Sequence, residues 1–588
     1  MDILWSASTT MRNPERAIYF LRTIAEIEGE NWNEETQIKY QILLIRNRYY
    51  KPTNKNLKSK QISILDDLQY NMTYEEAKDI FYSKNYTDGA MRGRTSFDPI
   101  EKLGLAFINS NGAIKISSLG KKFINEEIAL EDVVFNNLLK FQLTNPLTSD
   151  CKDYNTKPFI NILRLIKKVN LLCNKNDQKA KGVSRDEFGI FCLSIKNYND
   201  VDQKAQDLLE YRHNISRIDN EKDRNIYRTN YVNNYLSTYE NPVENTKEYT
   251  DNIVRYLRMT KYIYIRGGGY FIDLEPRRNI EIESLLEKDN GSAHDFTKDE
   301  YIEYLSNENS YELPFETQVK LVKIGEEIVF EINKLNEKIG NEKHLIFKPE
   351  KEIEKLKKQI ENLRNDRELI NALIMKKEYE DVGKIDNIIY SLNNIRDLEL
   401  KPSIALEKWT TISLNAIDDA LAVKSNAPLG DDYEPVFTAP AGVSDIECYY
   451  TNFGISCEVT MLTGRDQWFN EGQPVMRHLR NFENKNSGVD NYCIFIAPSI
   501  HQDTLNTFWN SVKYEYEGKK QKIIPLTIEM FIKILNAYKN NKINNKTLLS
   551  SDMQKLYEEC CEVTNIKSSS EWYNNIKECI NRFSNDVL

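Results

Sequence analysis

The sequence predicts a multidomain α/β protein with a helix-rich N-terminal region, a helical linker and a C-terminal domain built on a mixed sheet. Its 588 residues exceed what one ordinary hydrophobic core serves. Helical periodicity dominates the first part of the chain, and strand signals return after Pro402 alongside helical ones. We therefore expect subdomains at residues 1–150 and 151–310, a linker at 311–398 and a final domain at 399–588.

Composition indicates a folded intracellular protein, with 40% hydrophobic and 29% charged residues. The first residues lack a basic stretch followed by an apolar run, and no segment offers about 18 uncharged apolar residues. We therefore expect a cytoplasmic protein. The nine cysteines include no C-x-x-C pair, which predicts reduced, mostly buried thiols and neither a disulfide framework nor a zinc site.

Charge is distributed unevenly along the chain. The net charge of −10 argues at first sight against a nucleic-acid partner. Residues 1–278, however, hold 42 Lys and Arg against 37 Asp and Glu, whereas the remainder holds 37 against 52. This asymmetry is what a chain shows when its front half docks on phosphate and its back half is kept away from it.

Two N-terminal segments predict the same order of elements. Asn13 is first expected to cap a helix that begins at Pro14. Residues 75–124 then read as helix, turn, helix, strand, turn, strand and helix, and residues 249–276 read as a helix followed by two strands. This is the order of a winged helix.

Gly267 to Gly269 lie between the two strands of the second segment, where they are expected to form a hairpin turn. We reject a phosphate loop because no Gly-Lys-Ser/Thr follows these glycines.

Basic side chains on and near these units are the candidates for DNA contact. Helix residues that enter the major groove read base edges, and neighbouring turns hold phosphates. Each side chain taken singly also fits a solvated surface charge. The candidates are Arg12, Arg16, Arg92, Arg94, Lys102, Arg255, Arg258 and Arg266.

The segment from Glu316 to Leu398 is charged, poor in glycine and helical. A heptad pattern interrupted at Arg367 predicts an antiparallel pair of helices, acting either as a solvated brace or as a partner-binding surface. After Pro402, strands are expected at "KWTTISLNAID", "DIECYY", "ISCEVTML", "NYCIFIAP" and "KIIPLTIEMFIKIL". Helices are expected around residues 471–483 and 504–511.

The stretch "SDIECYYTNFGISCEVT" gathers acidic residues on two neighbouring strands. A turn centred on Asn452 and Phe453 would place Glu447 opposite Glu458, with Asp445 on the same face. Like charges placed so closely require solvent or a bound cation. A solvated surface hairpin and a Mg²⁺ site both fit, and a register shift of one residue would turn Glu458 away.

The spacing Asp-x12-Glu-x-Thr resembles the core of the PD-(D/E)xK nucleases. Thr460 stands where that core usually has lysine, and Ser444 where it has proline. Longer segments, including "RGRTSFDPIEKLGLAFINSNGAIKISSLGKKF" and "APAGVSDIECYYTNFGISCEVTMLTGRDQWFNEGQPVMRHL", resemble type IIS restriction endonucleases of the AlwI kind, a group that includes nicking enzymes. The resemblance implies an N-terminal DNA-recognition region with winged-helix units, a helical linker and a C-terminal nuclease domain.

The resemblance also implies roles for individual residues. Asp445 and Glu458 match acids that hold Mg²⁺, and Val459 would add a carbonyl ligand. The family has Thr at the lysine position, so Thr460 does not count against activity within this group. Other catalytic positions are matched by Glu407, Glu471 and His478. An isolated histidine near the end of an apolar helix is also commonly a hydrogen-bonded structural residue.

The resulting hypothesis is a type IIS restriction endonuclease, or a nicking enzyme of the same plan, that hydrolyses DNA outside an asymmetric site with one or two Mg²⁺ ions. Its partner is double-stranded DNA. A double-strand break would require a second nuclease domain, supplied by a transient homodimer or a small separate subunit. The alternative hypothesis is a winged-helix DNA-binding regulator with an inactive nuclease-like domain, which the missing lysine favours.

Overall fold

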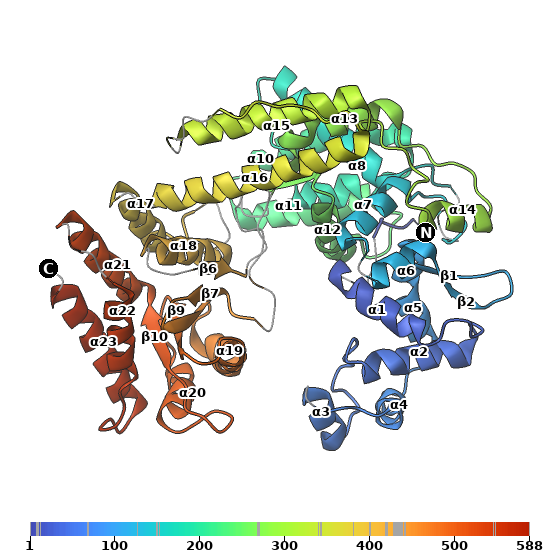
Figure 1. Cartoon of the computed structure of the whole chain (residues 1–588). Coiled ribbons are helices and arrows are strands. Elements are labelled where there is room, and N and C mark those ends of the chain that lie inside the picture. The colour runs from blue at the N-terminus through green and yellow to red at the C-terminus, as the bar shows by residue number, and fades with distance from the viewer. Residues whose placement is uncertain are drawn as a thin grey trace. The chain divides into compact units, whose positions relative to one another are not determined.

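The computed structural model describes residues 2–6, 11, 13–67, 70–125, 127–148, 151, 153–266, 271–338, 340, 344–379, 382–398, 402–417, 422–426, 439, 443–544, 546 and 549–586 (Figure 1). The chain divides into two compact units. The first contains residues 1–264 and 271–317, and the second contains residues 318–588 with the short segment 265–270. The finer division into four parts stays a prediction.

The first unit begins with the expected capped helix. Asn13 accepts a hydrogen bond from the Glu15 N–H at 3.1 Å and starts the 3₁₀ turn η1 (Pro14–Arg16), which continues as α1 (Ala17–Ala25). The other helices of this unit that lie outside the two predicted winged segments are α2 (Glu34–Arg46), α3 (Ser59–Asp66), α7 (Leu130–Lys140), α8 (Pro158–Lys175), α9 (Arg185–Glu187), α10 (Val201–Ser216), α11 (Glu221–Tyr235), α13 (Asn279–Lys288) and α14 (Lys298–Ser306). Short turns are η2 (Phe188–Cys192), η3 (Tyr198–Asp200) and η4 (Pro276–Arg278).

The first predicted winged segment has the expected order of elements. It consists of α4 (Tyr74–Ser83), α5 (Gly89–Lys102), β1 (Ala106–Ile108), β2 (Ile114–Ile116) and α6 (Ser118–Ile124). The two strands pair antiparallel with Ala106 opposite Ile116, and the Gly112 N–H donates to the Asn109 carbonyl at 2.9 Å to close the turn. The predicted hairpin is thereby confirmed.

The second predicted segment joins a three-stranded sheet. Helix α12 (Pro242–Met259) leads into β4 (Ile263–Arg266), and β5 (Phe271–Leu274) lies between β4 and β3 (Val183–Ser184). The register places Val183 opposite Ile272. The predicted turn at Gly267 to Gly269 lies outside the described residues.

The helical linker was predicted as an antiparallel pair, and this orientation is wrong. Helices α15 (Gln318–Lys338) and α16 (Ile353–Tyr379) lie side by side (Figure 1). The Leu345 carbonyl accepts from Asn333 at 2.9 Å and the Glu350 carbonyl accepts from Gln318 at 2.9 Å, so the connection runs back along α15. Helix α16 therefore starts beside the start of α15, and the pair is parallel.

The heptad interruption at Arg367 has a structural partner in this parallel pair. Arg367 is only 6% exposed, and its Nη1 lies 2.7 Å from Glu331 Oε2 of α15. Removing Glu331 would leave a buried guanidinium without its counter-charge, which is strongly unfavourable. The residue that interrupts the heptad pattern thus forms an ion pair between the two helices.

Helix α17 (Val382–Asn393) follows α16 in the chain.

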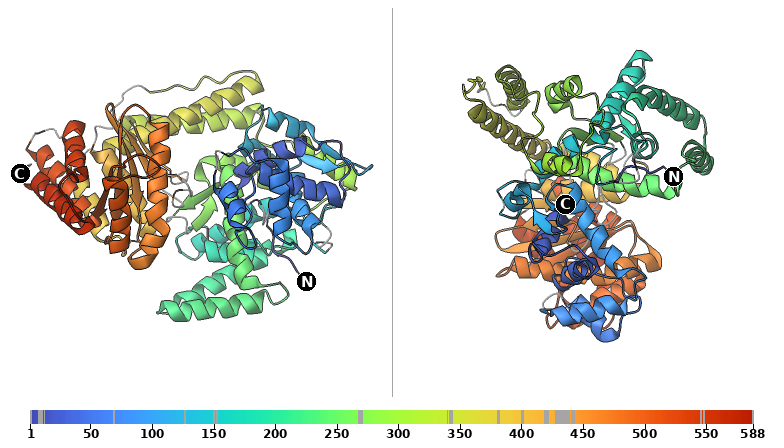
Figure 2. Two further views of the ribbon diagram at one scale, coloured as in Figure 1. Left: turned by 90° about the horizontal axis from the view of Figure 1, so that it is seen from below. Right: turned by 90° about the vertical axis from the view of Figure 1, so that its right-hand side faces the viewer.

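The C-terminal domain is a mixed five-stranded sheet covered by helices (Figure 2). The strand order is β10 (Ile523–Thr527), β9 (Asp490–Ala497), β8 (Phe453–Val459), β7 (Ile446–Tyr449) and β6 (Ala422–Ser425). Strands β10, β9 and β8 run parallel, whereas β8, β7 and β6 pair antiparallel. The helices are α18 (Pro402–Ala416), α19 (Gly464–Lys485), α20 (Gln502–Lys513), α21 (Ile528–Ile543), α22 (Ser550–Cys561) and α23 (Ser569–Asp586).

Two predicted strands need correction. In "KIIPLTIEMFIKIL" only Ile523–Thr527 is strand, because helix α21 begins at Ile528. The strand predicted at "KWTTISLNAID" is wrong because most of it belongs to helix α18. Its β-branched and hydroxyl residues favour extended structure in isolation. In the folded chain the Thr411 hydroxyl donates to the Glu407 carbonyl at 2.8 Å and the Ser413 hydroxyl to the Trp409 carbonyl at 2.6 Å. These bonds satisfy the hydroxyls inside a helix, so tertiary packing overrides local preference.

All nine cysteines are free thiols and eight of them are buried, as predicted. Their side chains therefore pack as small apolar groups. Within the part of the chain that the structure describes, no helix combines the length and apolar character needed to cross a membrane.

Replacing Gly93 with alanine tests the packing that holds α5. An added Cβ would lie 2.0 Å from the Gln37 carbonyl oxygen of α2, so the two helices must separate. We expect Gly93→Ala to lower the free energy of unfolding of the first unit by about 1–3 kcal/mol. Urea denaturation followed by fluorescence measures it, because Trp32 lies 4.6 Å from Phe97 of α5 between ring centroids.

The control is Met91→Ala on the same helix, where the side chain is 51% exposed. It should change the free energy of unfolding by less than about 0.5 kcal/mol. Equal destabilisation by the two substitutions would contradict the close approach at Gly93.

Candidate active site

The hairpin of β7 and β8 has a register two residues away from the expected one. Glu447 pairs with Ser456 and Ile446 with Cys457, so the expected pairing of Glu447 with Glu458 is wrong. Continuing this register brings Asp445 beside Glu458. The Val459 N–H donates to Asp445 Oδ2 at 2.7 Å. This hydrogen bond links the end of β8 to the residue that precedes β7.

Glu447 is neutralised by groups outside this pair. Lys485 Nζ of α19 lies 2.7 Å from Glu447 Oε2, and the Tyr449 hydroxyl donates to the same oxygen at 2.8 Å. Burial raises the pKa of Glu447, but the hydrogen bonds from Lys485 and Tyr449 outweigh it, so the pKa lies below its ordinary value. Glu447 is therefore an ordinary ion-paired acid and needs no metal.

Asp445 and Glu458 are in the opposite situation. Burial, followed by the negative charge of Glu458, raises the pKa of Asp445 well above its ordinary value. Burial, followed by the charge of Glu471, raises the pKa of Glu458 well above its own. Glu458 is only 4% exposed. Each carboxylate therefore penalises the ionisation of its neighbour.

Two helices add further acids to this pair. Glu407 of α18 is 1% exposed and accepts from the Ala439 N–H, with its two oxygens at 3.1 and 3.3 Å. Burial and then the charge of Asp445 raise the pKa of Glu407 to about 9. Glu471 of α19 has a pKa raised by burial, while the Thr460 hydroxyl bonded to it acts in the opposite direction.

His478 of α19 contacts the same cluster. Its Nδ1 lies 3.0 Å from Glu458 Oε1. Burial and then the charge of Arg477 lower the pKa of His478 to about 4, so the ring is neutral at physiological pH. Its buried Nε2 has no hydrogen-bond partner among the described residues. His478 thus orients Glu458.

The structure brings together all six residues that the resemblance pointed to: Glu407, Asp445, Glu458, Val459, Glu471 and His478. Sequence reasoning missed the Ser444 hydroxyl, which bonds Glu458 and lies 2.6 Å from the Ser456 hydroxyl. It also missed Lys485 as the partner of Glu447. No sequence pattern signals either contact, since both arise from strand register and from the packing of α19.

The donor set of this cluster fits Mg²⁺ in its chemistry. Mg²⁺ prefers carboxylate and carbonyl oxygens, and a cation relieves the mutual repulsion that raises the pKa values of Glu407, Asp445 and Glu458. Among the described residues, no group of three or more His, Cys, Asp or Glu side chains is arranged so that it could hold a metal ion. Mg²⁺ does not require one, because it keeps several waters and commonly takes one or two carboxylates plus substrate phosphate.

Arg16 and the candidate DNA-contact residues of the first winged segment are mostly engaged within the protein. Arg16 donates to the Tyr49 carbonyl and lies over the Phe20 ring. Arg94 pairs with Asp88 at 2.7 Å and Lys102 with Asp98 at 2.9 Å. Arg92 is different: it is exposed, its guanidinium lies 4.9 Å from the centroid of the Tyr86 ring, and it pairs with no acid that the structure describes.

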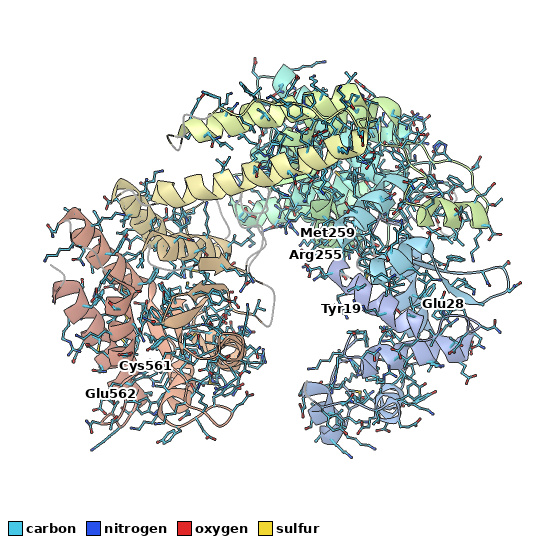
Figure 3. The ribbon with its side chains drawn as sticks, viewed as in Figure 1. Tyr19, Glu28, Arg255, Met259, Cys561 and Glu562 are labelled. Carbon is cyan, nitrogen blue, oxygen red and sulfur yellow. The ribbon has the colours of Figure 1, made fainter. Side chains whose placement is uncertain are left out.

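The remaining candidates belong to the second segment or lie outside the described residues. Arg255, which Figure 3 labels on α12, pairs with Asp251 at 2.8 Å. Arg258 follows on the same helix and is half-buried. Arg12 lies outside the described residues, and so does the side chain of Arg266. Most of the candidates whose side chains the structure describes therefore already have partners within the protein.

Comparison with known proteins identifies one family. The family model described as AlwI restriction endonuclease matches residues 101–534, which confirms the resemblance. No curated protein matches the chain. The solved structures that match it include two restriction endonuclease chains. The small subunit (R.BspD6I2) of the heterodimeric restriction endonuclease R.BspD6I has 20% identity and a TM-score of 0.28 and covers 34% of this chain and 98% of its own. Restriction endonuclease FokI has 12% identity and a TM-score of 0.21 over 95% of this chain and 99% of its own. At these TM-scores neither likeness supports a conclusion.

The raised pKa values predict how pH affects the metal-free protein. Glu407 has a folded pKa of about 9, above its value in the unfolded chain, so between the two values the folded state binds more protons. The free energy of unfolding of the C-terminal domain should therefore fall as pH rises from about 5 to 9. Thermal melting in EDTA measures this fall, and adding MgCl₂ should reduce it.

Glu407→Gln should make the dependence shallower, because glutamine stays neutral throughout this range; the part that comes from the raised pKa values of Asp445 and Glu458 should remain. A matched substitution is Glu447→Gln, which removes an acid whose folded pKa is lowered and should leave the fall in place. Parallel curves for wild type and Glu407→Gln would contradict the assignment of the charge repulsion to Glu407.

Proposed function

The chain belongs to the AlwI restriction endonuclease family, and from this premise we propose that it is a type IIS enzyme that cleaves or nicks DNA a few base pairs outside an asymmetric site. The proposed reaction is Mg²⁺-dependent hydrolysis of a phosphodiester. The observation that carries the proposal is the convergence of Glu407, Asp445, Glu458 and Glu471 from two helices and a hairpin onto one electrostatically coupled cluster.

Each residue of the cluster has a separate role in the proposed reaction. Asp445, Glu458 and the Val459 carbonyl would hold Mg²⁺, which when bound supplies positive charge that polarises the phosphodiester and favours formation of a hydroxide nucleophile. The Val459 N–H donates to one oxygen of Asp445, and His478 Nδ1 is hydrogen-bonded to one oxygen of Glu458. Both carboxylates are thereby held in position before substrate arrives.

Glu471 is the proposed acceptor for the proton of the attacking water. Its pKa is raised by burial and counteracted by Thr460, so it lies closer to neutral pH than that of a solvated carboxylate. A group with a pKa nearer the working pH is a better general base. Thr460 stands at the position where related nucleases have lysine. In this proposal its hydroxyl positions Glu471.

The proposed recognition region contains two winged-helix units, α5 with its β1–β2 hairpin and α12 with β4 and β5. Arg92 is the strongest candidate for reading a base, since it is exposed and arginine pairs in bidentate fashion with guanine. One catalytic cluster hydrolyses one strand at a time. A double-strand break would therefore need a second nuclease domain from another copy of the chain or from a separate small subunit.

Asp445→Asn should abolish cleavage and leave DNA binding unchanged, because it removes a proposed metal ligand from the C-terminal domain only. Loss of several kcal/mol of charge stabilisation corresponds to a rate decrease of at least about a thousandfold. Cleavage of plasmid DNA and gel-shift binding in EDTA measure the two effects.

The matched control is Glu447→Gln, an acid of the same hairpin that is paired with Lys485. It should retain cleavage within about tenfold. Full activity of purified Asp445→Asn would refute the proposed site, and equal loss in both variants would point to hairpin stability as the cause.

The alternative, a DNA-binding regulator with an inactive nuclease-like domain, is favoured by one observation: Thr460 replaces the usual lysine. Plasmid incubated with the protein should be nicked or linearised in Mg²⁺ and stay supercoiled in EDTA. Run-off sequencing of both strands then gives the site, the offset and the number of strands cut. Binding without any cleavage in Mg²⁺ would favour the regulator.

A further inference from the structure

A small pocket in the first unit gathers basic residues that have no role in the proposal so far. It opens between α9, α11 and α12. Three cationic side chains line it: Arg185 of α9, Arg228 of α11 and Lys247 of α12. Asn225 and Thr229 of α11 add polar side chains to its wall. Of the candidate DNA contacts expected from the sequence, none lines this pocket.

The walls of the pocket are held close together by the packing of η2 against α12. A Cβ at Gly189 of η2 would lie 2.7 Å from the Thr246 carbonyl oxygen and 2.8 Å from the Thr250 hydroxyl, so only glycine permits this approach. Helix α9 is anchored by a capping box in which Ser184 and Glu187 bond reciprocally. The pocket is therefore a preformed feature of the unit.

Charged side chains in and beside the pocket carry an excess of positive charge. Arg185 Nη2 lies 3.0 Å from Asp251 Oδ1, and Arg255 Nη2 lies 2.8 Å from the other oxygen of the same carboxylate. Arg228 Nε lies 2.9 Å from Asp186 Oδ2. Of the charged residues that line the pocket, three are cations (Arg185, Arg228 and Lys247) and one is a carboxylate (Asp186). Burial lowers the pKa of Arg185, and the charge of Asp251 acts in the opposite direction.

Lys247 is the cationic side chain of the pocket that an anion from solvent can reach. It is exposed at the mouth of the pocket and pairs with no acid that the structure describes. Lys247, Asp251 and Arg255 are spaced by four residues and so follow one face of α12, on which Figure 3 labels Arg255. The positive region therefore continues from the pocket along a helix already proposed to lie at DNA.

We propose that this pocket binds one phosphate of the DNA backbone. Lys247 and Arg228 provide the charge, and Asn225 orients Arg228 by accepting from its Nη1 at 2.6 Å. The inference rests on the proposed function, because it needs DNA to be the ligand. A phosphate contact carries no sequence information and fixes the register of the protein on the duplex.

The test measures binding of a duplex of random sequence to the full chain in EDTA at several salt concentrations. Each phosphate contact contributes about one to the slope of log affinity against log salt. We expect Lys247→Ala to make the slope shallower by about one. Thr229→Glu, which places a carboxylate at an exposed position of the pocket wall, should weaken binding further. Circular dichroism checks that both variants are folded.

The control is Lys358→Ala, an exposed lysine of α16 in the second unit that likewise pairs with no described acid. It should leave the slope unchanged. Unchanged slopes for both pocket variants, with normal wild-type binding, would overturn the inference and leave the proposed function intact. Failure of the wild-type chain to bind DNA would overturn both.

Inorganic phosphate distinguishes a free anion from the DNA backbone. Calorimetric titration of phosphate against chloride at equal ionic strength is made with wild type and Thr229→Glu. Weak phosphate binding that is lost in Thr229→Glu, together with the shallower DNA slope, supports the inference. Phosphate binding lost in the variant without any change in the DNA slope would assign the pocket to a free anion and overturn the DNA contact.

Discussion

Electrostatic repulsion among Glu407, Asp445, Glu458 and Glu471 is the constraint around which the C-terminal domain is built. Four neighbouring carboxylates, of which Glu407 and Glu458 are buried, cannot all ionise without a compensating charge, and their raised pKa values express this cost. The fold tolerates the cost because strands β7 and β8 and helices α18 and α19 are fixed by the surrounding core. A bound positive charge would lower the electrostatic energy of every carboxylate in the cluster.

Glu447 shows that the repulsion is specific to the cluster. It lies on the same hairpin and is equally buried, yet Lys485 and Tyr449 satisfy it completely and its pKa is lowered. Glu447 thus has a lysine partner, whereas the acids of the cluster have none among the described residues. The nearest basic group inside the cluster is His478, which is neutral. Acids left without cationic partners are the signature of a functional site.

Ion pairs also occur in the regions outside the cluster, and there each of the following acids has a basic partner. Glu331 and Arg367 align two parallel linker helices, and Asp88 and Asp98 hold Arg94 and Lys102 on α5. A paired arginine can exchange its carboxylate for a phosphate on binding, so these pairs do not exclude DNA contact. Arg92 and Lys247 differ because they are exposed and pair with no acid within the described residues.

The sequence by itself determined the order of helices and strands around the first hairpin, the capped first helix, the reduced cysteines and, through family resemblance, the acids of the site. These follow from local patterns: capping residues, turn residues and period-two alternation. Tertiary structure decided the rest. The β7–β8 register, the helix at residues 402–416 and the parallel linker depend on contacts between distant residues such as Val459 with Asp445 and Glu331 with Arg367. Local preference carries no information on such contacts, because they form only when the core excludes the alternatives.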